Sequence, residues 1–215
     1  MRIVDNLMRW WHVVFGTHGS WLPGDARGFR DRRHRVHSSG DYKSPPPAGE
    51  HARLREAAAR AMRPAVEVPP EARKDVVAAL REASARRAFP LLAVASGDVH
   101  AHLLVMLSMS YGEAKRDAGQ IKNGSSFGLR DVLPGRLWSH GTTPKAICDA
   151  DHLREAFFYI RDRQERGAVT WGDAILFEAA TAHYPRLPPR RREDRPDAAA
   201  EAAGDAWAQE RRSHP

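Results

Sequence analysis

The chain has 215 residues, a formal net charge of +7 at pH 7 and a pI near 10.1. This length predicts one domain, and 42% hydrophobic residues are enough to build its core. The single cysteine, Cys148, excludes an internal disulfide and favours a reducing compartment. No apolar run approaches the roughly 20 residues that span a bilayer, and the N-terminus lacks a signal-peptide pattern, so we expect a soluble cytoplasmic protein without a membrane partner. The basic charge favours a polyanion such as nucleic acid, although a solvated basic surface would give the same balance.

The N-terminal part predicts one strand followed by a long insertion. Residues 10–17 are aromatic and β-branched, which is typical of a strand. Residues 19–69 form a segment longer than a compact domain usually carries, rich in Gly, Pro and Arg, with an Ala- and Arg-rich helix predicted over 50–62. A second helix is predicted over 71–87, because Pro70 suits its first turn and apolar residues recur at helical spacing.

The central part predicts a hairpin and a helix. Residues 90–95 and 100–107 are short apolar runs separated by the turn residues Ser96-Gly97-Asp98. Residues 111–130 are polar and Lys-bearing, which favours a helix despite several glycines.

The C-terminal part predicts two short strands and an amphipathic helix. The strands are expected at residues 137–138 and 146–147. The helix begins after a cap at Asp149 or Asp151 and ends near Gly167, which suits the position after a helix end. Its apolar stripe consists of Leu153, Ala156, Phe157 and Ile160.

The order of these elements predicts an α+β domain over residues 1–184, with a small antiparallel sheet and helices on one side of it. Residues 185–215 lack a periodic apolar face, so we expect a disordered basic and Ala/Glu-rich tail.

The sharpest chemical signal is the pair His100 and His102. Side chains alternate across a strand, so both imidazoles project from one face while Ala101 points to the other. Two imidazoles side by side are a good start for a divalent metal site. Taken alone, such a pair is more often two surface or hydrogen-bonded histidines.

Tyr159 is the tyrosine that falls on the predicted amphipathic helix. A tyrosine can form a covalent intermediate, but its pKa near 10 requires help, which a metal that polarises the scissile phosphate supplies. Without the histidines, a half-buried structural tyrosine would be the better interpretation.

Four motifs follow one another in a defined order: the strand W-H-V-V-F-G-T at residues 11–17, H-A-H-L-L-V at 100–105, L-W-S-H-G at 137–141, and Tyr159 followed by isoleucine. In this order and spacing they resemble the HUH single-tyrosine transposases, which include the REP-associated tyrosine transposases and related insertion-sequence transposases. The resemblance spans residues 10–167.

The resemblance implies a ferredoxin-like domain and Mg²⁺ or Mn²⁺ held by His100, His102 and a polar residue near the tyrosine. It gives Tyr159 the role of nucleophile, which attacks a phosphodiester of single-stranded DNA, forms a 5′-phosphotyrosine and leaves a 3′-OH. A DNA hairpin next to the cleavage site provides recognition, and relatives act as monomers or as homodimers.

The third metal ligand departs from the family pattern. The family usually has Gln or Asn one helical turn after the tyrosine, where this chain has Arg163. The predicted third ligand is Gln164, displaced by about 100° around an ideal helix, and Asp162 is another option. Three functions therefore stay open: an active nuclease and strand transferase, an inactive domesticated protein that binds DNA hairpins, and an unrelated metal enzyme that combines the two histidines with carboxylates.

Basic residues just after the histidine strand are predicted to contact DNA phosphates. They are Lys115, Arg116 and Lys122, in a region that also contains glycine and serine. A solvated helix face explains the same residues about equally well.

Overall fold

The computed structural model describes residues 8–25, 49–61 and 65–183. The predicted tail at residues 185–215 and most of the loop within the predicted insertion lie outside this part of the chain.

A five-stranded antiparallel sheet forms the centre of the domain, in the order β4-β1-β3-β2-β5. Its strands are β1 (Met8–Gly16), β2 (Leu91–Ser96), β3 (His100–Ser108), β4 (Lys145–Ala146) and β5 (Val169–Gly172). The predicted first strand and the predicted hairpin are confirmed.

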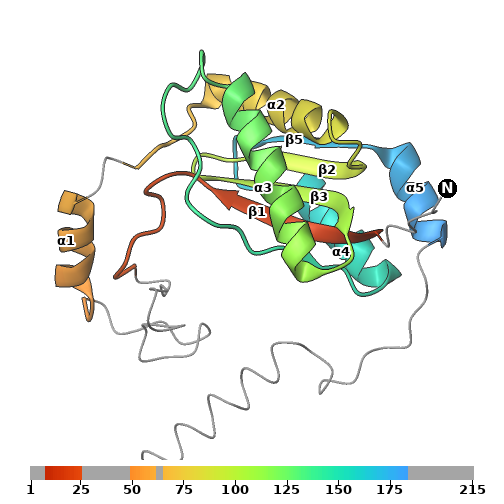
Figure 1. Ribbon diagram of the computed structural model, residues 1–215, viewed down its shortest axis with the longest axis horizontal. Coiled ribbons are helices and arrows are strands. Elements are labelled where there is room, and N and C mark those ends of the chain that lie inside the picture. The colour runs from red at the N-terminus through yellow and green to blue at the C-terminus, as the bar shows by residue number, and fades with distance from the viewer. Residues whose placement is uncertain (1–7, 26–48, 62–64, 184–215) are drawn as a thin grey trace, which may run out of the picture.

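The first six core elements follow the sequence β1-α2-β2-β3-α3-β4, and their strands lie in the order β4-β1-β3-β2. This is the ferredoxin-like arrangement. The helices α2 (Arg73–Ala85) and α3 (Tyr111–Gly128) cover one face of the sheet (Figure 1). They bury the apolar side chains of that face, among them Val13 and Phe15 of β1 and Leu103 of β3. The predicted α+β fold is therefore confirmed.

The helix α4 (Ala150–Asp162) covers the opposite face, so the prediction of helices on one side only is wrong (Figure 1). Its apolar stripe packs on sheet residues such as Leu92 and Leu104. Phe157 also stacks on Phe177 of α5 (Ala174–His183), with ring centroids 4.0 Å apart. Neither β5 nor α5 was predicted.

Helix α3 forms despite its glycines because its start is capped and its inner face packs. The hydroxyl of Ser110 accepts a hydrogen bond from the Glu113 amide, which caps the start of the helix, and donates one to the Glu113 carboxylate. A Cβ on Gly124 would lie 3.1 Å from the Cβ of Ala83, so glycine lets α3 approach α2 closely.

Four smaller predictions differ in outcome. The helix predicted over 50–62 is present as α1 (Ala52–Ala61), and the one predicted over 71–87 as α2, after a 3₁₀ turn at Pro70–Ala72. The strand predicted at 137–138 is only an isolated bridge between Thr17 and Trp138. Helix α4 ends at Asp162 rather than near Gly167. Within the described ranges, no helix has both the length and the apolar character needed to cross a bilayer.

Candidate functional site

The two histidines of β3 project from the face of the sheet that α4 covers. Ala101 and Leu103, which alternate with them, lie in the core under α2 and α3, whereas Leu104 packs with α4. The rings of His100 and His102 have centroids 4.8 Å apart and are nearly perpendicular. The predicted placement of both imidazoles on one face is confirmed.

A third histidine joins them from the neighbouring strand. The Nε2 atom of His12 lies 3.0 Å from the Nδ1 atom of His102, a hydrogen-bond distance. Strand alternation gives the reason, because Trp11 and Val13 are buried under α2 and α3 and His12 must face the other way. The alternation was readable in the sequence, but the pairing of β1 with β3 was not.

Tyr159 of α4 lies next to His12 and His102. Helix α4 begins at the Asp149 cap, whose carboxylate accepts the His152 amide at 2.8 Å, and its buried stripe fixes the rotation of the helix. The Tyr159 ring centroid lies 5.5 Å from that of His102 and 6.1 Å from that of His12. The tyrosine is 42% exposed, so the predicted nucleophile is accessible beside the predicted metal ligands.

Burial keeps two of the three imidazoles neutral. It lowers the pKa of His12 to about 4 and that of His102 to about 3. The positive charge of Lys145 lowers both pKa values further. Neutral imidazole is the form that binds metals.

In the His12–His102 pair, one ring nitrogen of His102 has no hydrogen-bond partner. His102 is 6% exposed, and its Nε2 atom is buried and unpaired. Such an atom is costly unless it has a ligand. When the Nδ1–H of His102 donates to His12, the lone pair lies on Nε2, which is the tautomer that binds a metal. In that tautomer, His12 positions the ring of His102.

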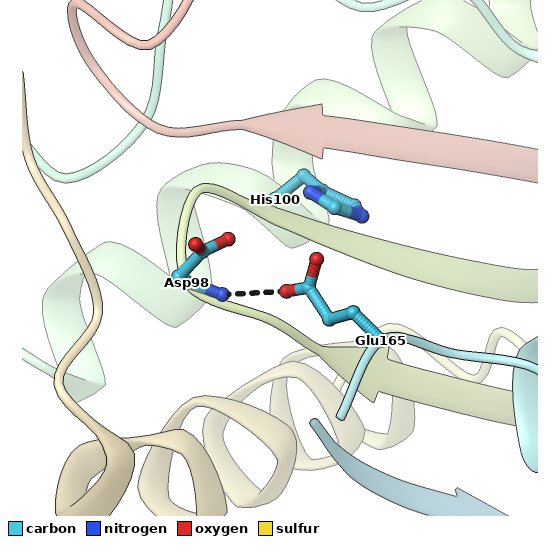
Figure 2. Close-up of side chains that lie close together, drawn as sticks. All are labelled: Asp98, His100 and Glu165. Atoms are coloured by element: carbon cyan, nitrogen blue, oxygen red, sulfur yellow. Dashed lines mark hydrogen bonds between the residues drawn. The ribbon is translucent and has the colours of Figure 1, made fainter. Parts of the chain in front are cut away.

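The carboxylates of Asp98 and Glu165 lie near His100, at the start of β3. Asp98 precedes the strand, and Glu165 comes from the loop after α4. One ligand atom from each of these two residues and from His100 lies within 4.8 Å of the others, as Figure 2 shows. These three residues form the Asp98 cluster. Neither carboxylate was predicted from the sequence.

The predicted third ligand has another partner. The side-chain amide of Gln164 donates to the backbone carbonyl of Tyr159 at 2.8 Å and so caps the end of α4. Arg163 occupies the C-cap position of that helix. The residue of this loop that approaches His100 is Glu165.

The three predicted DNA contacts do not join the histidines. Lys115 and Arg116 are exposed on α3, and Lys122 lies on the same helix, across the sheet from Tyr159. The basic residue that does join the site is Lys145, which lies directly opposite His12 in the pairing of β4 with β1. Residues opposite one another in an antiparallel pair share a face of the sheet.

Lys122 is 8% exposed, and its ammonium donates to the carbonyls of Ser139 (2.9 Å) and Gly141. Burial lowers the pKa of Lys122 to about 8. These bonds hold the segment after α3 against the helix. They also form one wall of a surface pocket of about 430 Å³, which is lined by Lys115 and residues 135–142 among others.

Substitution of Lys122 by Met is expected to lower the free energy of unfolding by about 1–3 kcal/mol, because two carbonyls lose their charged donor. Urea unfolding at pH 7 measures the change. Lys115→Met, on the exposed part of the same helix, should stay within about 0.5 kcal/mol of the parent. Equal, small effects of both substitutions would mean that Lys122 has no structural role.

No protein-family model matches the sequence, and neither the curated proteins nor the solved structures contain a significant match. The function of the site is therefore inferred from its own side chains.

Proposed function

We propose that the protein is a metal-dependent endonuclease and strand transferase for single-stranded DNA, with Tyr159 as nucleophile. The observation that carries this proposal is the position of Tyr159, an accessible phenol above two histidines of which one has a buried, unpaired nitrogen. A nucleophile next to a metal site is an arrangement that suits covalent cleavage of a phosphodiester.

The donor set fits a divalent cation. The Nε2 atom of His102 is buried and has no hydrogen-bond partner, and the neighbouring His100 offers a second imidazole. Mg²⁺ or Mn²⁺ bound beside these imidazoles would polarise the scissile phosphate. Lys145 adds positive charge on the same face, which favours a phosphate over a neutral substrate.

The chain's own residues then perform the transfer. The Tyr159 oxygen attacks phosphorus, and the bond from phosphorus to the 3′ oxygen breaks. The phenol loses its proton and the departing 3′ oxygen gains one, so no net proton is consumed. A second 3′-OH attacks the phosphotyrosine in the reverse sense and releases Tyr159. The covalent intermediate thus conserves the bond energy for strand transfer.

The alternative of a metal enzyme that combines histidines with carboxylates is favoured by one observation, the Asp98 cluster. Such an enzyme would bind a divalent cation without forming a tyrosine adduct. Its requirement for metal is shared with the nuclease, so only the fate of DNA distinguishes the two.

Purified protein incubated with Mn²⁺ and labelled single-stranded hairpin DNAs is expected to give a covalent, slow-migrating product on a denaturing gel. DNA that flanks the gene is the natural source of hairpins. Fully paired duplexes of the same sequence, and reactions with a chelator, should give none. Hairpin binding without any adduct would instead indicate an inactive DNA-binding protein, and metal binding without DNA binding would indicate the unrelated enzyme.

A further inference from the structure

The Asp98 cluster brings two carboxylates together at the turn between β2 and β3. One Glu165 oxygen, Oε1, accepts the backbone amide of Asp98 at 3.0 Å. The Oδ1 oxygen of Asp98 accepts the amide of Val99 at 2.7 Å. Figure 2 shows the second Glu165 oxygen pointing toward the ring of His100. Among the described residues, these bonds occupy one oxygen of each carboxylate, which leaves the other oxygen available to a ligand.

The backbone leaves room for Glu165 in this position. A Cβ built on Gly97 would lie 1.9 Å from the Oε1 atom of Glu165, which no pair of atoms tolerates. The absence of a side chain at residue 97 therefore permits the carboxylate to lie against the turn. Any larger residue would displace the end of the Glu165 side chain while leaving every ligand in the chain.

The ligand atoms of the Asp98 cluster suit a hard divalent cation. Carboxylate oxygens suit Mg²⁺ and Mn²⁺, and an imidazole nitrogen is accepted more readily by Mn²⁺. Three protein ligands leave open positions for water or a phosphate oxygen. His102 borders this cluster, with its ring centroid 4.8 Å from that of His100, and it is 6% exposed with a buried Nε2 atom that has no hydrogen-bond partner.

We propose that Asp98, His100 and Glu165 hold a divalent cation, Mn²⁺ or Mg²⁺, beside His102, and that Glu165 takes the ligand position that the family resemblance gives to Gln164. This inference deepens the proposed nuclease function and rests on it for the purpose of the cation, but binding of the cation is measurable without DNA. Gln164 then has a structural role at the end of α4.

The test is a titration of the full chain with Mn²⁺. Binding is measured as the decrease of the electron paramagnetic resonance signal of free Mn²⁺. Glu165→Gln keeps the size of the side chain and an oxygen for the Asp98 amide, but it removes the charge. We expect it to weaken Mn²⁺ binding at least ten-fold, since even outer partners of metal ligands are worth about 10–100-fold. Gln164→Ala is the matched control on the neighbouring residue, and its affinity should stay within about two-fold of the parent.

Gly97→Ala provides a second variant that retains all three ligands. It should also weaken Mn²⁺ binding, because the new methyl group displaces the Glu165 carboxylate. Circular dichroism and thermal unfolding establish that each variant folds.

The outcomes separate this inference from the proposed function. Mn²⁺ binding that depends on Glu165, in a protein that forms no DNA adduct, supports the cation site and contradicts the nuclease. A metal-dependent adduct with Mn²⁺ affinity unchanged in folded Glu165→Gln overturns the cation site and leaves the nuclease. Absence of Mn²⁺ binding in the parent, or loss of it in Gln164→Ala alone, also overturns the cation site.

Discussion

Tyr159→Phe is expected to lower the rate of covalent adduct formation with single-stranded hairpin DNA by at least about a thousand-fold, as removal of a nucleophile does in other enzymes. Phenylalanine retains the ring that packs against His102 and His12 but lacks the attacking oxygen. The DNA affinity of the variant should stay within about two-fold of that of the parent, because the substitution removes only one hydroxyl group from an exposed side chain. Single-turnover reactions resolved on denaturing gels give the rate, and a filter-binding assay gives the affinity.

Tyr111 provides a matched control for this substitution. It is also exposed, but it lies at the start of α3 beside Trp11, across the sheet from the histidines. Tyr111→Phe should therefore form the adduct at the parent rate. An adduct that persists in Tyr159→Phe, or one that disappears in Tyr111→Phe, would remove Tyr159 from the role of nucleophile.

The part of the site that the sequence predicted depends on local periodicity. The spacing of His100 and His102 on an apolar strand places both on one face, and the helical stripe that ends at Ile160 places Tyr159 beside that face. Both patterns are properties of a few consecutive residues. Packing of the two apolar surfaces against one another then brings the polar residues together.

The parts that were missed depend on contacts between distant segments. His12 reaches His102 through the register of β1 on β3, a separation of 90 residues that no local pattern specifies. Glu165 reaches the β2–β3 turn from the loop after α4, across 67 residues. Its neighbour Gln164 matched the family pattern by residue type, but an amide near a helix end can also cap the helix, and here it does.

The missed fifth strand and last helix have weak signals of their own. Strand β5 has four residues, all of intermediate burial, so it carries neither a buried run nor a clear alternation. Helix α5 has ten residues and is anchored through Phe177 against Phe157. Both elements are stabilised by the sheet and by α4 rather than by their own periodicity, and such elements are the ones that sequence patterns predict least well.

The buried histidine pair makes a prediction about acid stability in the absence of metal. Burial lowers the folded pKa of His12 to about 4, below its ordinary value of 6.5, so between these pH values the unfolded chain binds a proton that the folded protein does not. Stability rises with pH wherever the unfolded state binds more protons, and it must therefore fall as the pH drops from 6.5 to 4. At 1.36 kcal/mol per pKa unit, His12 alone is expected to lower the free energy of unfolding by roughly 3 kcal/mol over this range. His102, with a folded pKa of about 3, acts in the same direction.

Guanidinium unfolding with a chelator present, at intervals between pH 7 and pH 5, measures this slope while carboxylates still remain largely ionised. His12→Gln removes one titrating group and retains an amide that can bond to His102, so its stability should depend less steeply on pH than that of the parent. A parent protein whose stability is flat from pH 7 to pH 5 would show that the imidazoles of His12 and His102 accept protons in the folded state, and the unpaired nitrogen of His102 would then not be held ready for a cation.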